Sequence, residues 1–177
     1  MLRALKLSLW KQLGASIDML ENAILLIPKD QWDVNKKLFY NAYHCVVFLD
    51  YYLTIPPNGF SAVLPFTITT PDHIPAGALD DLVPDRIYNK EELLDYVKLC
   101  RDKCRKLVAG LTEERMDGRW IEEPDEVGAP ATMNYSVLEI LLYNMRHVQH
   151  HAAQLNLLLR QIINNAPGWV SSANGDL

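Results

Sequence analysis

Apolar residues recur at alternating spacings of three and four along four stretches of the chain, the pattern of an α-helix with one buried face. The first stretch is the clearest, and its repeating positions are Trp10, Leu13, Ile17, Leu20, Ile24 and Ile27. The four stretches cover residues 2–27, 36–53, 90–111 and 135–163. No part of the chain shows sustained alternation with a period of two. The pattern therefore predicts an all-α fold.

Residues with strong start and stop preferences flank the predicted helices. Pro28 ends the first helix, and Asn89 with Glu92 three residues later forms a capping-box pattern at the start of the third. At the start of the fourth helix, both Ser136 and Asn134 are candidate N-caps. These signals support the boundaries that the apolar pattern indicates.

The connection between the second and third helices, residues 55–88, contains six of the ten prolines. It is too long for a tight turn, so we interpret it as a crossover between helices or as a flap over one end of a bundle. Helices of similar length with one apolar stripe bury those stripes by packing together. We therefore predict a four-helix bundle over residues 1–163, followed by a C-terminal tail, residues 164–177, that frays.

Composition and charge restrict the class of protein. With 177 residues, 49% of them apolar and 22% charged, the chain fits one globular domain. Its formal net charge of −5 disfavours a nucleic-acid partner, and no apolar run is long enough to cross a membrane. The N-terminal segment continues as an amphipathic helix, unlike a signal peptide. Three cysteines, an odd number, argue against a disulfide framework, so we expect a cytoplasmic protein.

Three of the five histidines fall on the predicted apolar stripes. His147 and His151 are four residues apart, so their imidazoles lie about 40° apart around one helix and one turn apart along it. That spacing lets both rings face one metal ion, with His44 of the second helix as a third ligand. His150, three residues from His147, is an alternative to His151. A histidine pair at this spacing is also common on helix surfaces.

Burial of several imidazoles favours the metal hypothesis on energetic grounds. Each neutral ring presents one donor and one acceptor, and a buried polar group without a partner costs about 1–3 kcal/mol. A divalent cation satisfies one nitrogen of each ring and leaves the other for a neighbouring group. Asn144 and Gln154, on or beside the same stripe, are candidates for that neighbour or for holding a metal-bound water.

Further residues are candidates for the surroundings of the site. Tyr40 and Tyr51 share the stripe of His44 and either line a pocket or pack in the core. His73, in the proline-rich connection, is a candidate acid, base or extra ligand, or is simply exposed. We interpret Asp50 as an exposed helix charge.

Two further groups of side chains have simple structural interpretations. Cys100 and Cys104 have the spacing of a ligand pair, but free cysteine usually behaves as a small buried apolar residue. The connection at residues 117–134 carries an acidic cluster that we expect at the solvated surface: Glu122, Glu123, Asp125 and Glu126.

The stretch at residues 135–155 resembles the last helix of the DinB/YfiT-like superfamily, because it contains His147, His150, His151 and Gln154 in the order His-x-x-His-His-x-x-Gln. His44 stands where that family places its first histidine, on the second helix. The resemblance covers residues 1–163, including the long connection after the second helix. It implies a four-helix bundle whose metal ligands are His44, His147 and His151.

The same resemblance implies nickel or zinc as the metal and a homodimer as the assembly. Characterised relatives include S-transferases that use low-molecular-weight thiols, a thiol-dependent isomerase and metal-dependent hydrolases. One departure concerns activity: the family often has Arg-Gly between the histidine pair and the glutamine, whereas this chain has Ala152-Ala153.

Three neutral imidazoles would leave a metal ion with its full positive charge and an open position, as in catalytic sites. Such a site fits a transferase or a hydrolase. No Glu-x-x-His, His-Glu-x-x-His, Gly-x-Ser-x-Gly or glycine-rich phosphate loop points to another chemistry. The sequence therefore predicts a metal-dependent enzyme acting on a small molecule. The alternative is a non-enzymatic, dimeric helical module whose metal is structural or absent.

Overall fold

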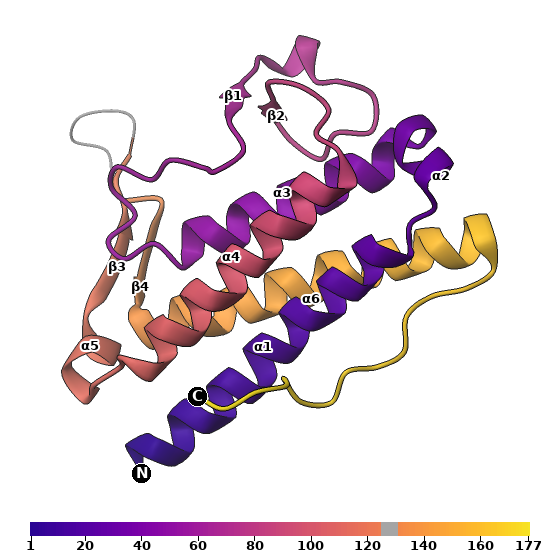
Figure 1. The fold of residues 1–177 in the computed structure, drawn as a ribbon. Helices are drawn as coiled ribbons and strands as arrows, with labels where there is room; N and C mark the ends of the chain where they lie inside the picture. The colour runs from indigo at the N-terminus through magenta and orange to yellow at the C-terminus, as the bar shows by residue number, and fades with distance from the viewer. Residues whose placement is uncertain (125–130) are drawn as a thin grey trace.

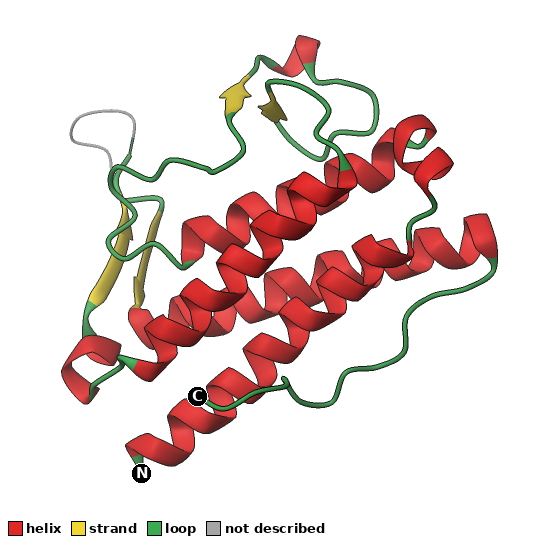
Figure 2. Ribbon diagram, in the orientation of Figure 1, coloured by secondary structure: helices red, strands yellow, loops and turns green. Residues whose placement is uncertain are grey.

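The computed structural model describes residues 1–124 and 131–177, and helices dominate them (Figure 2). Four helices are long: α1 (Leu2–Leu26), α3 (Lys36–Tyr52), α4 (Lys90–Ala109) and α6 (Val137–Ile163). Each falls within two residues of the range that the apolar pattern predicts at both ends. Two short helices, α2 (Lys29–Val34) and α5 (Glu113–Asp117), lie in the connections, where the pattern showed no repeat. The all-α expectation is confirmed in this broad form.

Local signals account for where the long helices begin. Asn89 accepts a hydrogen bond from the backbone N–H of Glu92, whose carboxylate accepts one from the backbone N–H of Asn89, so the predicted capping box is present. For α6 the side chain of Ser136, rather than that of Asn134, accepts from the backbone N–H of Glu139. Pro28 ends α1 and is the N-cap of α2.

The four long helices surround one apolar core. α1 packs against α4 and α6, and α3 packs against the same two helices. The predicted stripe of α1 is fully buried, with Leu13, Ile17, Leu20 and Ile24 at 0% exposure. The connection after α3 returns along the molecule, so that α3 and α4 run in the same direction (Figure 1). Among the described residues, no helix is long and apolar enough to span a membrane.

The two long connections contain short antiparallel strand pairs that the sequence pattern did not predict. In the first, β1 (Phe66–Ile68) pairs with β2 (Leu82–Pro84), and the 3-10 turn η1 (Pro71–His73) lies between them. In the second, β3 (Arg119–Glu122) pairs with β4 (Met133–Ser136). Strands of three or four residues are too short to show a period of two. Of the predicted acidic cluster, Asp125 and Glu126 lie outside the described residues.

The C-terminal tail does not fray, which corrects the sequence-based expectation. It returns along α1 (Figure 1), where the backbone N–H of Ala173 donates to Lys11 O at 2.9 Å and Trp10 Nε1 donates to Gly175 O at 3.1 Å. Gly14 permits this approach, because a Cβ there would lie only 2.7 Å from Ala173 Cβ. The tail is short, but these two hydrogen bonds and the packing of Ala173 in the core fix it to the helix.

Candidate metal centre

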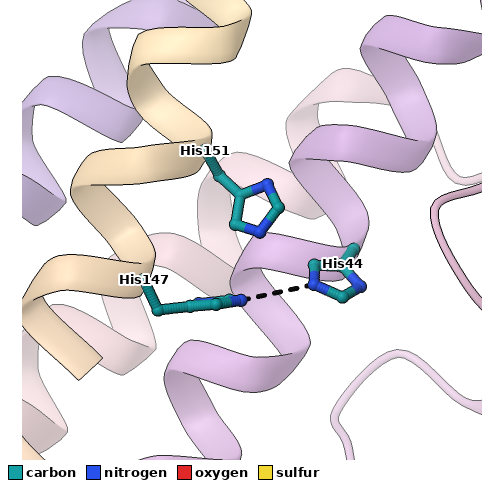
Figure 3. Close-up of side chains that lie close together, drawn as sticks. All are labelled: His44, His147 and His151. Carbon is teal, nitrogen blue, oxygen red and sulfur yellow. Dashed lines mark hydrogen bonds between the residues drawn. The ribbon is translucent and has the colours of Figure 1, made fainter. Parts of the chain in front are cut away.

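The structure brings His44 of α3 together with His147 and His151 of α6 (Figure 3). α3 and α6 pack against each other, and the two histidines of α6 are one turn apart, so all three rings face the same seam. One potential ligand atom from each ring lies within 4.8 Å of the other two. Groups of three or more histidine, cysteine or acidic side chains can hold a metal ion when their ligand atoms lie this close together. Among the described residues, these three histidines form such a group.

The distances fit a shared cation. The Nε2 atoms of His44 and His147 are 3.3 Å apart, and one ring nitrogen of His151 points toward the gap between them (Figure 3). Two nitrogens bound to one tetrahedral zinc ion at about 2.0–2.1 Å are themselves roughly 3.3–3.4 Å apart. The first pair therefore already has the spacing that a common ion requires.

Burial keeps two of the rings in the form that binds metals. It lowers the pKa of His147 to about 3, and the neighbouring ring of His151 adds to the effect. Burial likewise lowers the pKa of His151 to about 4, with His44 adding to it. Both imidazoles are neutral at pH 7, and a neutral imidazole has the free lone pair that a metal ion needs. The buried Nδ1 atoms of both rings have no hydrogen-bond partner among the described residues.

Asp80 lies directly behind His44 on the side away from the other two rings. Its Oδ2 is 2.9 Å from His44 Nδ1, although the ring N–H is not well aligned with it, and its Oδ1 accepts from the backbone N–H of Leu82. Burial opposes the charge on Asp80, but the contacts with His44 and Leu82 outweigh it and lower the pKa of Asp80. A carboxylate behind a histidine in this way is the usual support for a metal-binding imidazole.

Aromatic side chains surround the rings. Phe48 lies one turn after His44, and its ring centroid is 4.6 Å from that of His44 and 5.7 Å from that of His147. The ring of Tyr52, one turn further along α3, meets His147 edge-on at 5.6 Å. These apolar neighbours limit access of water to the seam and explain much of the desolvation of the imidazoles.

Comparison with known proteins identifies the family of the chain. A family model described as the DinB superfamily matches residues 12–155, which is most of the chain and includes all three histidines. The chain belongs to the DinB superfamily. No curated protein and no solved structure gives a significant match.

Two residues predicted beside the histidines have partners elsewhere in this DinB protein. Asn144 is fully buried, and its Nδ2 donates to Leu49 O of α3 at 3.0 Å, whereas its Oδ1 has no partner among the described residues. The amide of Gln154 links Asn41 of α3, at 2.7 Å, to Nε2 of His150, at 2.9 Å. Gln154 thus fixes His150 beside the triad, and His151, not His150, completes the three-histidine group.

The other candidates lie away from the imidazoles. The Tyr51 hydroxyl donates to Glu122 of β3 at 2.8 Å, and Tyr40 packs edge-on against Phe39. His73 is exposed in η1, where its Nδ1 is 2.7 Å from Thr70 Oγ1. Tyr52 and Phe48, rather than Tyr51, contact the site because they follow His44 at intervals of four. That spacing was available in the sequence, whereas nothing in the sequence pointed to Asp80.

The structure places Ala152 and Ala153, which stand where the resemblance implies Arg-Gly, in two different surroundings. Ala152 is completely buried in the core, so it contributes packing and has no room for a long side chain. Ala153 instead lines a groove of about 730 Å³ between α6, α1 and the tail. Of the three histidines only His147 lines this groove, together with Arg146, Tyr143 and Trp169.

Proposed function

We propose that this DinB-superfamily protein is a metal-dependent enzyme in which His44, His147 and His151 bind one divalent ion, nickel or zinc. The observation that carries the proposal is the convergence of three imidazoles from two helices, two of them neutral, with the Nε2 atoms of His44 and His147 facing each other at 3.3 Å. Imidazole nitrogens are donors that suit both nickel and zinc.

Each side chain has a defined role in the proposed site. When bound, a cation held by three neutral imidazoles supplies Lewis acidity, which lowers the pKa of a thiol or a water at an open position. Asp80 orients His44 through Nδ1, while Phe48 and Tyr52 restrict water. Such a site serves an S-transferase that uses a low-molecular-weight thiol, or a hydrolase.

The groove beside His147 supports the substrate side of the proposal. Arg146 is the cation among its lining residues, and Tyr143, Met145 and Trp169 provide apolar surface. A thiol that carries a carboxylate complements that combination. The parallel pair α3 and α4, joined by the long connection, supports a four-helix bundle, and a homodimer is the assembly we propose for it.

Metal analysis tests the proposal directly. The protein is purified without a nickel column, dialysed against zinc or nickel, and its metal content is measured by inductively coupled plasma mass spectrometry. We expect about one ion per chain, and we expect His151→Ala to lower the affinity more than about 100-fold because a three-nitrogen site loses one ligand.

His150→Ala and His73→Ala are the matched controls, since each removes a histidine outside the triad. Both variants are expected to keep one ion per chain. Wild-type protein without stoichiometric metal after reconstitution with either ion contradicts the proposal. Stoichiometric metal whose removal lowers the melting temperature, in a protein inactive toward thiol and ester substrates, supports a structural metal instead.

A further inference from the structure

A second concave surface lies at the end of the molecule where α4 meets α5 and β3. It has a volume of about 870 Å³ and shares no lining residue with the triad or with the groove beside His147. Its walls come from the C-terminal half of α4, from α5 and the start of β3, and from the residues just after α3. We call it the α4–α5 pocket.

The floor of the α4–α5 pocket is apolar. Leu53, Leu111 and Val137 lie in it with at most 4% exposure, and Leu107 is half-buried beside them. At the rim, Leu99 is 56% exposed and Ile55 is 36% exposed. Apolar side chains of this size lose free energy when they face water, so a concave apolar floor with exposed apolar edges suits an apolar ligand.

The rim also collects positive charge in a chain whose net charge is −5. The pocket is lined by one acidic residue, Asp102, and by four cationic residues: Lys103, Lys106, Arg115 and Arg119. Lys103 is neutralised by Asp50, at 2.5 Å. The other three form no ion pair with any residue in the described part of the chain.

The hydrogen-bond partners of the two arginines, Arg115 and Arg119, are neutral. Arg115 donates to Gly110 O at 3.1 Å, so it also helps to cap α4, and Arg119 donates to the side chain of Asn134. Capping explains the position of Arg115 but neither the charge of Lys106 nor the apolar floor. The guanidinium groups are held in place, yet their charge stays available to an anion.

We propose that the α4–α5 pocket binds a small organic anion with an apolar body, such as a medium-chain carboxylate. The apolar body would lie on Leu53, Leu107 and Val137, and the carboxylate would lie near Lys106 and Arg119. The volume is in the range of sites that enclose one small molecule, about 300–1,000 Å³. A concave surface favours this occupant over a flat membrane.

Titration of the full-length, ¹⁵N-labelled protein with sodium decanoate tests the proposal. We expect saturable binding with the largest amide shifts at Leu99, Leu107 and Ile55, and none of that size at His44. Decanol has the apolar chain of decanoate without its charge, and butyrate has the charge without the long apolar chain. Both are therefore expected to bind at least about tenfold more weakly than decanoate.

Two neighbouring charge reversals form a matched pair, because both residues are exposed on α4 but only one lines the pocket. Lys106→Glu is expected to weaken decanoate about tenfold, and Arg105→Glu less than about twofold. Absence of saturable decanoate binding overturns the proposal, as does equal weakening by both variants or shifts centred on the triad. Sedimentation with anionic phospholipid vesicles, in a protein that ignores decanoate, overturns it in favour of a membrane surface.

Discussion

Two buried polar clusters extend from α3, one toward α4 and the other toward α6, and they differ in how their atoms are paired. In the first, the Asp50 carboxylate accepts from the Tyr96 hydroxyl at 2.7 Å and from Lys103 Nζ at 2.5 Å, and Lys103 also contacts Thr54 Oγ1 at 2.6 Å. In the second, the buried Nδ1 atoms of His147 and His151 have no partner among the described residues.

The difference separates a structural cluster from a binding site. The Asp50 cluster satisfies its own charges, so it stabilises the contact between α3 and α4 without a ligand. Burial and the hydrogen bond to Asp50 raise the pKa of Tyr96, which keeps this hydroxyl a donor. The histidine cluster instead turns the Nε2 atoms of His44 and His147 toward each other, with a ring nitrogen of His151 close to both, and a cation between them would take the lone pairs of these nitrogens.

Acidification is expected to lower the free energy of unfolding mainly through the histidine cluster. The pKa values of about 3 for His147 and about 4 for His151 lie below the usual 6.5, so between about pH 4 and 6.5 the unfolded chain binds more protons than the folded one. Stability of the metal-free protein therefore falls as the pH falls through that window, by about 3 kcal/mol between pH 7 and 5. Urea unfolding of the EDTA-treated protein measures it.

A double variant isolates the histidine contribution. His147→Gln with His151→Gln is expected to flatten this pH dependence, whereas His73→Gln, which changes an exposed histidine, is expected to leave it unchanged. An equal slope in the double variant and the wild type would contradict the assignment.

The paired cluster is tested by Asp50→Ala. This change leaves the buried Tyr96 hydroxyl without its acceptor and frees Lys103, so we expect a loss of about 2 kcal/mol in the free energy of unfolding. Metal stoichiometry is expected to stay at the wild-type value. Asp102→Ala, on an exposed acidic residue beside Lys103, is the control, and a loss as large in that variant would contradict the structural role of Asp50.

The smallest effect is expected at the carboxylate behind the metal site. Asp80→Asn keeps the size of the side chain but removes the charge that supports His44, so the dissociation constant for zinc should rise about tenfold. Isothermal titration calorimetry gives this value. Asp81→Asn changes the adjacent carboxylate, which does not contact His44, and is expected to leave the zinc affinity unchanged. Equal zinc affinities in the wild type and both variants would contradict the supporting role of Asp80.

Local patterns predicted much of this molecule. The apolar stripes located the four long helices to within two residues, and the capping box at Asn89 was read directly. The three histidines were found because two of them are four residues apart on one helix and the third lies on the stripe of another. Short-range periodicity was sufficient for the helices and the capping box, whereas for the histidines it left His150 open as an alternative to His151, and the family resemblance implied the final set.

Features that depend on distant contacts were missed or misread. Asp50 was interpreted as an exposed charge, but it is 7% exposed because Tyr96 and Lys103, more than 40 residues away, pair with it. Asp80 lies in an irregular connection whose path no periodicity describes. The tail was expected to fray because its attachment joins the two ends of the chain, through the backbone of Lys11 and the indole of Trp10, and no local pattern reveals such a pairing.

Crystals of the zinc- or nickel-loaded protein, measured on both sides of the corresponding absorption edge, test the central claim most directly. The account predicts one anomalous peak per chain, bonded to a ring nitrogen of each of His44, His147 and His151, with Asp80 against the far side of His44. A loaded crystal with no peak between these rings, or with the ring of His44 turned away from the other two, would contradict it.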